Sequence, residues 1–260
     1  MNIDLTGKHA VVCGSTQGIG MEAALKLSQL GASITLVARN EMKLKEVLGK
    51  LTPHDKNDYI VADFSRPSDL MEKVNSWASK HTANILVNNT GGPKGGPIID
   101  AAVSEFIGAF NNHLICNHIM VKALWKGMKE EGYGRIINVI STSVKQPLDG
   151  LGVSNTVRGA VANWSKTLAN ELGQYNITVN NVLPGATNTS RLQSIAESKA
   201  AQSSGLDYEE IMAVMAAQSP MKRIAEPEEI ANAIAFLSSP AASYINGINV
   251  PVDGGRTKSL

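Results

Sequence analysis

The sequence predicts an α/β fold in which helices cover both faces of a parallel sheet. Two observations support this class. Short apolar runs rich in Val and Ile, typical of buried strands, alternate along the chain with longer segments whose apolar residues recur at helical spacing. No linker-like stretch divides the chain, so we expect residues 1–260 to form a single domain.

Seven strands are expected from the apolar runs. The first run, HAVVC, is apolar almost without interruption, and strands of a parallel sheet show this pattern because helices cover both of their faces. The expected strands are His9–Cys13, Ile34–Ala38, Tyr59–Ala62, Ile85–Asn88, Arg135–Ile140, Thr178–Leu183 and Ile248–Val252.

Six helices are expected between these strands. Gly31 is placed to end the first helix, because glycine adopts the left-handed conformation that often follows a helix. The expected helices are Ile19–Leu30, Glu41–Leu51, Ser68–His81, Ser104–Met128, Asn155–Leu172 and Pro227–Leu237. Right-handed crossovers would make this a doubly wound, Rossmann-type sheet of seven parallel strands.

One long insertion, residues 186–222, follows the sixth expected strand. It contains two helical pieces, Thr189–Ala201 and Asp207–Gln218, which the sequence Ser-Ser-Gly separates. An insertion beyond the carboxyl end of a parallel strand lies where a substrate lid is commonly found. We therefore expect a lid here.

The composition excludes several function classes. The 24 basic and 23 acidic residues are spread along the chain and give a net charge of +1, so no basic face for nucleic acid is expected. No apolar run approaches the roughly 20 residues that cross a bilayer, and the N-terminus does not resemble a signal peptide. Cys13 and Cys116 lack metal-ligand spacing, which favours buried free thiols, a cytoplasmic location and no metal site.

The segment CGSTQGIG follows the first expected strand and opens the first helix. Gly14 would allow the sharp turn, Gly18 the approach of a diphosphate, and Gly20 the close packing of helix on strand. The helix N-terminus offers free N–H groups and a positive dipole end to phosphate. The expected phosphate-binding residues are Gly14, Ser15, Gln17, Gly18, Ile19 and Gly20.

The end of the second strand bears on the choice of nucleotide. An NAD site places an acidic residue here for the ribose 2′-hydroxyl, whereas this chain has Arg39, which can pair with a 2′-phosphate. The sequence therefore favours NADP(H) over NAD(H). Asp63, after the third strand, would either accept a hydrogen bond from the adenine amine or cap the turn before Pro67.

Several motifs together resemble the short-chain dehydrogenase/reductase family, especially its β-ketoacyl-acyl-carrier-protein reductase-like members. They are the glycine motif of residues 14–20, Asn88-Asn89-Thr90-Gly91, Pro184-Gly185 and Val252-Asp253-Gly254-Gly255. They occur in family order over nearly the whole chain. The resemblance implies that four further residues contact the cofactor, namely Asn89, Gly91, Pro184 and Gly185.

The resemblance also implies four catalytic positions, which hold Asn, Ser, Tyr and Lys in the family. Only Ser141 clearly matches. Ser154 occupies the Tyr position, Arg158 the Lys position and His113 the Asn position, with Asn112 beside it. The chain is therefore similar to a divergent member that lacks the Tyr-x-x-x-Lys motif.

These replacements leave the source of the proton open. Ser154 is too short and too weak an acid to replace a phenol, and Arg158 can supply charge or hold the nicotinamide ribose but cannot usefully give up a proton. The candidate donors are Lys145, His113 and a water held by Ser154 and Ser141. The alternatives are that Lys145 is a solvated loop residue and that His113 is a core histidine.

Three interpretations of function follow. The first is an NAD(P)(H)-dependent oxidoreductase that reduces a small-molecule carbonyl, for example a 3-oxoacyl thioester, or acts on the corresponding alcohol. The second is a dinucleotide-binding sensor, scaffold or partner subunit without redox turnover, and the third is a lyase or isomerase. Lys94, in a glycine-rich loop, is a candidate contact for an anionic substrate. The resemblance implies a homodimer or homotetramer.

Overall fold

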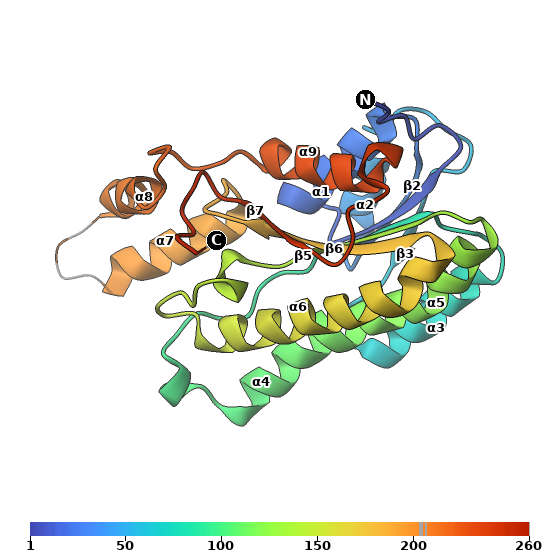
Figure 1. Ribbon diagram of the computed structural model, residues 1–260. Helices are drawn as coiled ribbons and strands as arrows, with labels where there is room; N and C mark the ends of the chain where they lie inside the picture. Colours follow the sequence, from blue (N-terminus) through green and yellow to red (C-terminus); the bar gives the residue numbers. More distant parts are fainter. Residues whose placement is uncertain (203–204, 206, 260) are drawn as a thin grey trace.

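The computed structural model describes residues 1–202, 205 and 207–259, and they form a seven-stranded parallel sheet (Figure 1). The strand order is β3-β2-β1-β4-β5-β6-β7. The order reverses between β1 and β4, and this confirms the doubly wound topology predicted from the sequence. Ligands of such sheets bind at the carboxyl ends of the strands, beside the reversal.

Every expected strand is present, with ends that differ by at most one residue from the sequence prediction. Their bounds are β1 His9–Cys13, β2 Ser33–Ala38, β3 Asp58–Val61, β4 Ile85–Asn88, β5 Gly134–Val139, β6 Ile177–Pro184 and β7 Asn249–Val252. The strand boundaries were predictable because the apolar runs end abruptly in Gly, Asn or charged residues.

Helices cover both faces of the sheet, α1, α2 and α9 on one and α3 to α6 on the other (Figure 1). Their bounds are α1 Gly18–Gln29, α2 Glu41–Leu48, α3 Pro67–Ala78, α4 Val103–Phe110, α5 Cys116–Glu130, α6 Gly152–Leu172, α7 Ser190–Gln202, α8 Tyr208–Ala217 and α9 Pro227–Ser238.

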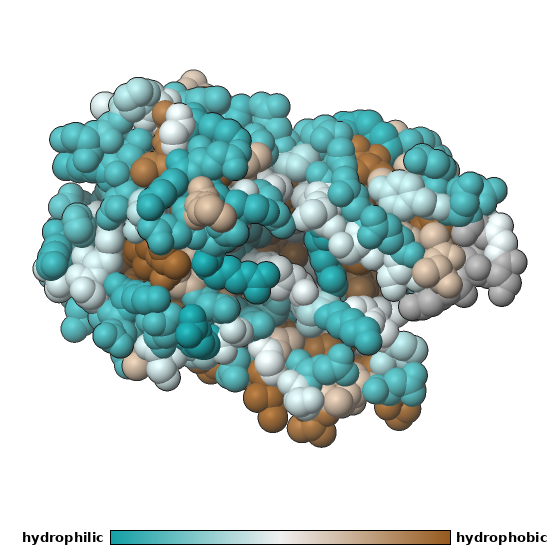
Figure 2. All heavy atoms as spheres, turned by 180° about the vertical axis from the view of Figure 1, so that it is seen from behind, coloured by the Kyte–Doolittle hydropathy of each residue, from teal (hydrophilic) through white to brown (hydrophobic). Residues whose placement is uncertain are grey.

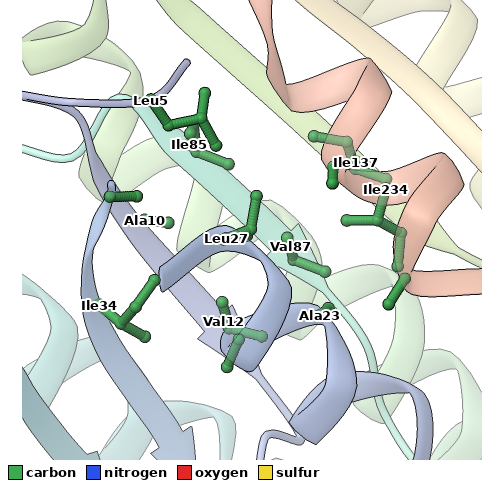
Figure 3. Packing of buried hydrophobic residues seen from close by; sticks show 14 of the residues in the cluster. Leu5, Ala10, Val12, Ala23, Leu27, Ile34, Ile85, Val87, Ile137 and Ile234 are labelled. Carbon is green, nitrogen blue, oxygen red and sulfur yellow. The ribbon is translucent and has the colours of Figure 1, made fainter. Parts of the chain in front are cut away.

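Two apolar cores lie on the two sides of the sheet. On β1, Val12 points into the core beneath α1 and α9, while Val11 belongs to the core beneath α3 and α5. Figure 3 shows the first core, where Ala23 and Leu27 of α1 pack over the sheet. This two-sided burial is the physical reason that the strands are apolar throughout and do not alternate.

Four of the expected helices differ clearly from the sequence prediction, and of these α2 and α3 end three residues earlier than expected. The segment expected as one long helix, Ser104–Met128, contains a π-helical turn, Asn111–Ile115, between α4 and α5. Helix α6 begins at Gly152, earlier than expected, so Asn155 lies within the helix and does not cap it. Its side-chain amide donates to the Leu148 carbonyl at 2.9 Å, which fixes the preceding loop on the helix.

The insertion between β6 and α9 carries α7 and α8, which stand to one side of the sheet in Figure 1. The two helices pack on each other through a small core of their own, with Ala196, Ile211 and Met215 buried. After the insertion, the chain returns to the sheet through α9 and β7. The first turn of α7 therefore lies close to the end of β6, near the carboxyl edge.

Both cysteines are buried and free, as the sequence predicted. Cys116 donates from Sγ to the Phe64 carbonyl at 3.2 Å, and burial raises its pKa to about 12. It therefore stays a thiol at neutral pH. None of the helices in the described part of the chain combines the length and the apolar character that a transmembrane span requires.

Candidate active site

The glycine loop between β1 and α1 has the geometry that its sequence predicts. Gly14 and Gly18 have positive φ angles, 60° and 53°, which side chains disfavour. A Cβ on Gly20 would lie 2.2 Å from the Gly14 carbonyl oxygen, and one on Gly14 would lie 2.5 Å from the Asn89 carbonyl oxygen. The backbone segments of three elements therefore meet here at distances that only glycine allows.

The N-terminus of α1 is left open to a ligand. Gln17 occupies the N-cap position without a side-chain hydrogen bond to the helix, and no acidic residue lies in the first turn. Its first N–H groups and its positive dipole end therefore remain for an anion. These features fit the diphosphate of a dinucleotide.

Three other residues of the loop hold it in place. The fully buried Ser15 accepts a hydrogen bond from the Val37 N–H at 3.1 Å, so its oxygen joins the loop to β2. Gln17 donates to the Ser190 hydroxyl at 2.9 Å and thus connects the loop to α7. Ile19 packs against the apolar core.

Arg39 and Asp63 lie at the ends of β2 and β3. Arg39 is exposed and, in the described part of the chain, has no ion pair, so its guanidinium is free to meet a 2′-phosphate. Asp63 accepts a hydrogen bond from the Ser65 N–H at 2.9 Å. That bond, aided by the charges of Arg39 and Arg66, holds the pKa of Asp63 below its usual range. The structure therefore shows the turn contact of Asp63, while its contact with adenine stays a prediction.

The loops after β4 and β6 frame the same edge. The Asn89 amide donates to the Gly14 carbonyl at 3.3 Å, so the loop after β4 is held on the glycine loop. Gly91 faces open space. After Pro184 ends β6, the Gly185 N–H donates to the Val252 carbonyl at 3.0 Å. The four residues that the resemblance assigned to the cofactor thus lie in loops at the edge where a cofactor would bind.

Ser141 follows β5 and caps a short 3₁₀ turn. Its side-chain oxygen accepts a hydrogen bond from the Ser143 N–H at 3.1 Å. Because the Ser141 oxygen acts as the acceptor in this bond, its O–H group remains free to donate. The side chain is half-buried, so it can meet a ligand while part of its surroundings excludes water.

Two polar side chains near Ser141 have no partner among the residues that the structure describes. Lys145 ends the 3₁₀ turn and is half-buried. Ser154 lies in the first turn of α6, four residues before Arg158 and therefore on the same helix face. The Ser154 hydroxyl therefore has no hydrogen-bond partner among the described residues.

Arg158 is buried, with 8% of its surface exposed. One guanidinium nitrogen, Nη1, donates to the Val139 carbonyl at 2.8 Å, whereas Nε has no partner. Burial, together with the charge of Arg191, lowers the pKa of Arg158 to about 10, so it remains protonated at neutral pH. A fixed positive charge therefore lies about one helical turn after Ser154 on α6.

His113 does not fit the predicted role of proton donor. It lies in the π turn, 2% exposed, and its Nδ1 is 2.6 Å from the Thr90 hydroxyl oxygen. Burial, with the charges of Arg158 and Arg191, lowers its pKa to about 2. His113 is therefore neutral at physiological pH, which argues against an imidazolium acid and favours the alternative of a core histidine.

Arg191, in the first turn of α7, is a candidate that the sequence analysis missed. It donates to the Pro93 carbonyl, in the loop after β4, and so crosses from the insertion to the sheet edge. One signal was available in the sequence, because no acidic residue lies three or four positions from Arg191 to pair with it on the helix.

Seen from behind, the surface is hollowed between the lobe of α7 and α8 and the body of the molecule (Figure 2). At the carboxyl edge of the sheet an anion cradle on α1 adjoins the half-buried hydroxyl of Ser141 and the buried charge of Arg158. These features define a Rossmann-type nucleotide-binding protein in which a polar, positively charged site accompanies the nucleotide cradle.

The comparisons with known proteins give the family. The family model described as Enoyl-(Acyl carrier protein) reductase matches residues 14–257. The chain belongs to the short-chain dehydrogenase/reductase family, as the motifs had suggested.

Three relatives show how broad the likeness is. NADPH-dependent reductase BacG of Bacillus subtilis is 29% identical over 98% of this chain and 100% of its own. The 3-oxoacyl-[acyl-carrier-protein] reductase FabG of Pseudomonas aeruginosa is 29% identical over 99% of this chain and 100% of its own. The crystal structure of L-sorbose reductase from Gluconobacter frateurii, complexed with NADPH and L-sorbose, has a TM-score of 0.91 and 32% identity, with both chains fully covered.

Proposed function

We propose that the protein is an NADP(H)-dependent oxidoreductase that reduces the carbonyl group of a small molecule and takes the proton from a group other than tyrosine. One observation carries this proposal. A complete nucleotide cradle, with an uncapped α1 N-terminus and a free Arg39, shares the sheet edge with the Ser141 hydroxyl, which is free to donate. The relatives named as NADPH-dependent support the choice of nucleotide.

The residues of this chain have distinct tasks in holding the nucleotide. The N–H groups of the glycine loop, residues 14–20, bind the diphosphate, and Arg39 binds the 2′-phosphate. Arg158 would hold the nicotinamide ribose, and Pro184 and Gly185 would contact the nicotinamide half of the cofactor. Bound NADPH supplies the hydride that reduces the carbonyl carbon.

Ser141 stabilises the charge that grows on the carbonyl oxygen. Its O–H is oriented because its oxygen already accepts from the Ser143 N–H. A donor fixed before the reaction stabilises a developing oxyanion more than a mobile one does. Within the single domain that we propose for residues 1–260, the insertion 186–222 is the lid that excludes water over this site.

The proton source is Lys145, acting through Nζ. It lies on the turn that begins at Ser141, is half-buried, and has no partner in the described part of the chain. Ser154 leaves the space of a phenol empty, and a water held there between Ser154 and Ser141 would carry the proton from Lys145 to the alkoxide.

The test is the oxidation of NADPH, followed by absorbance, with a panel of aldehydes and ketones. For a substrate that turns over, Lys145→Ala is expected to lower kcat about 10²- to 10⁴-fold, the usual contribution of a general acid. Lys56→Ala, an exposed lysine in the loop before β3, is the matched control. An undiminished kcat in Lys145→Ala, with loss in His113→Asn, would contradict the assignment of Lys145.

A second function, dinucleotide binding without redox turnover, is favoured by one observation. Ser154 replaces the tyrosine, and no other phenol takes its place in the motif. Tight NADPH binding with no oxidation by any member of the panel would select this alternative, in which the chain acts as a sensor, scaffold or partner subunit.

We propose that the protein forms a homodimer or homotetramer in a reducing compartment such as the cytoplasm. Exposed apolar side chains gather on α4 and the turn before it, and they include Ile98, Ile99, Val103, Ile107 and Phe110. Near β7, the Tyr244 side chain is fully exposed. The resemblance implies subunit contacts through the two long helices expected at Ser104–Met128 and Asn155–Leu172 and through the C-terminal strand. Light scattering at micromolar concentration, with Val103→Glu as the interface variant, tests this proposal.

A further inference from the structure

Two guanidinium groups come together beside the loop that follows β4. A Cβ placed on Gly92 would lie 3.6 Å from Nη2 of Arg191 and 3.9 Å from Nη2 of Arg158. Arg158 comes from α6 and Arg191 from α7, so the two side chains reach this point from different helices.

Neither guanidinium is neutralised by the protein. Within the described residues, the ion pairs of arginine are limited to Arg223 with Glu229, in which two parallel hydrogen bonds form. Arg158 instead has a single hydrogen bond to a backbone carbonyl, and Arg191 likewise donates to a carbonyl. The two cations therefore face each other without a counter-ion.

Two neighbouring buried cations without a counter-ion raise the free energy of the folded protein. Burial and mutual repulsion lower the pKa of Arg158, and burial lowers that of Arg191. A buried cation is retained at such a cost where an anion completes it, because charge-assisted bonds to a carboxylate are strong in a site with little water. The unpartnered Nε of Arg158, in a side chain more than nine-tenths buried, is a donor that still lacks an acceptor.

The position of the pair distinguishes it from the diphosphate site. The diphosphate is assigned to the N-terminus of α1, which the first turn of α7 contacts through Gln17 and Ser190. Arg158 instead bonds to Val139, on the strand that leads directly to Ser141. Arg158 therefore connects the guanidinium pair to the strand that leads to the reacting residue Ser141.

We propose that Arg158 and Arg191 together bind a carboxylate of the substrate, so that the protein acts on keto acids or the corresponding hydroxy acids. This inference rests on the proposed function and names its substrate class. Guanidinium groups match carboxylate oxygens in pairs, and Arg158 has donors to spare for the ribose because it carries five N–H groups. Arg191 reaches the anion from the lid, so binding of the carboxylate would also hold the lid closed.

The test measures binding, which does not depend on turnover. Calorimetry on the enzyme saturated with NADP⁺ compares pyruvate, 4-oxopentanoate and 5-oxohexanoate with their methyl esters, which lack the charge. We expect at least one acid to bind at least tenfold more tightly than its ester. Arg191→Gln should remove that preference, Arg191→Lys should keep part of it, and Arg66→Gln, an exposed control, should leave it unchanged.

Two results would overturn the inference. One is equal affinity of every acid and its ester for the wild-type protein. The other is a loss of NADPH affinity in Arg191→Gln as large as the loss of acid affinity, because the arginine would then belong to the cofactor phosphates. If the protein oxidises NADPH with the esters and shows no preference for the acids, the proposed oxidoreductase function is supported and the carboxylate site is refuted. If the protein does not bind NADPH, both the proposed function and the carboxylate site are refuted.

Discussion

The two halves of the site differ in how closely they keep the pattern of their family. In the nucleotide half, around β1 and α1, the glycines stand where backbone contacts demand them, and Arg39 is free at the end of β2. In the reacting half, around β5 and α6, the resemblance matches Ser141 alone, and we propose that Ser154 and Arg158 stand at the tyrosine and lysine positions.

This difference teaches which constraints are geometric and which are chemical. A Cβ at Gly20 would collide with the Gly14 carbonyl, so the nucleotide half cannot change without moving the backbone. At Ser154, by contrast, none of the described residues bonds to the side chain, and we propose that Lys145 takes over the proton transfer. The four predictions below probe one half or the other.

Of these four, the largest effect is expected in the reacting half, for Ser141→Ala. Loss of an oriented donor to a developing oxyanion lowers kcat by about 10²- to 10³-fold. NADPH affinity should stay the same, since the hydroxyl is assigned to the substrate. Ser76→Ala, an exposed serine of α3, serves as the control in the same NADPH oxidation assay. A normal kcat in Ser141→Ala would place the reaction elsewhere.

In the nucleotide half, Arg39→Ala should weaken NADPH binding by about 10- to 100-fold, the usual worth of hydrogen bonds to a charged group. NADH binding should not change, because NADH lacks the 2′-phosphate. Calorimetry with both nucleotides measures the ratio. Equal losses of affinity for NADPH and NADH would show that Arg39 does not bind the 2′-phosphate. Arg66→Ala, which also removes one positive charge, is the control for a nonspecific effect of charge.

Gly20→Ala is expected to disturb the contact between the glycine loop and α1. The new Cβ would lie 2.2 Å from the Gly14 carbonyl oxygen, and relief of that clash should cost about 1–3 kcal/mol of stability. Urea unfolding measures this cost. Gly108→Ala, on α4, is the matched control because its Cβ would meet no atom within 4 Å. An unaltered midpoint for Gly20→Ala would contradict the packing described.

The smallest effect concerns acid stability. The pKa of His113 is about 2 in the folded protein and near 6.5 when the side chain is solvated, so the unfolded chain binds the extra proton between these values. Stability should therefore be lost as the pH falls below 6.5, by about 1.4 kcal/mol per pH unit from this residue.

His9, whose pKa burial lowers to about 4, adds a similar loss over a narrower range. Urea unfolding at pH 7 and pH 5 should show a smaller pH dependence in His113→Asn than in wild type. The exposed His54→Asn variant should keep the wild-type dependence. An unchanged slope in His113→Asn would mean that His113 is charged in the folded protein.

The fold was almost fully predictable from sequence, and the site only in part. Strands such as His9–Cys13 were found because two covered faces require continuous apolar residues. The π turn at Asn111–Ile115 was not found, since its residues have no pattern that separates it from an α-helix. Its consequence, the burial of His113 against Thr90, therefore also escaped prediction.

Arg191 shows the same limit from another direction. Its partner Arg158 lies on a different helix, and the sequence gives no measure of the distance between α6 and α7. Sequence could show that Arg191 lacks a local acid, but its approach to a second buried cation depends on tertiary structure. The glycine loop and Ser141, in contrast, are positioned by the strands that precede them, and their place could be predicted.

The central claim is that the nucleotide half of the site is functional although the reacting half has diverged. Titration of the wild-type protein with NADPH and then with NADH, by calorimetry, tests this claim most directly. The account predicts one NADPH site per chain, with NADH bound more weakly. No binding of either nucleotide would contradict it, and would mean that the cradle on α1 is retained for the fold alone.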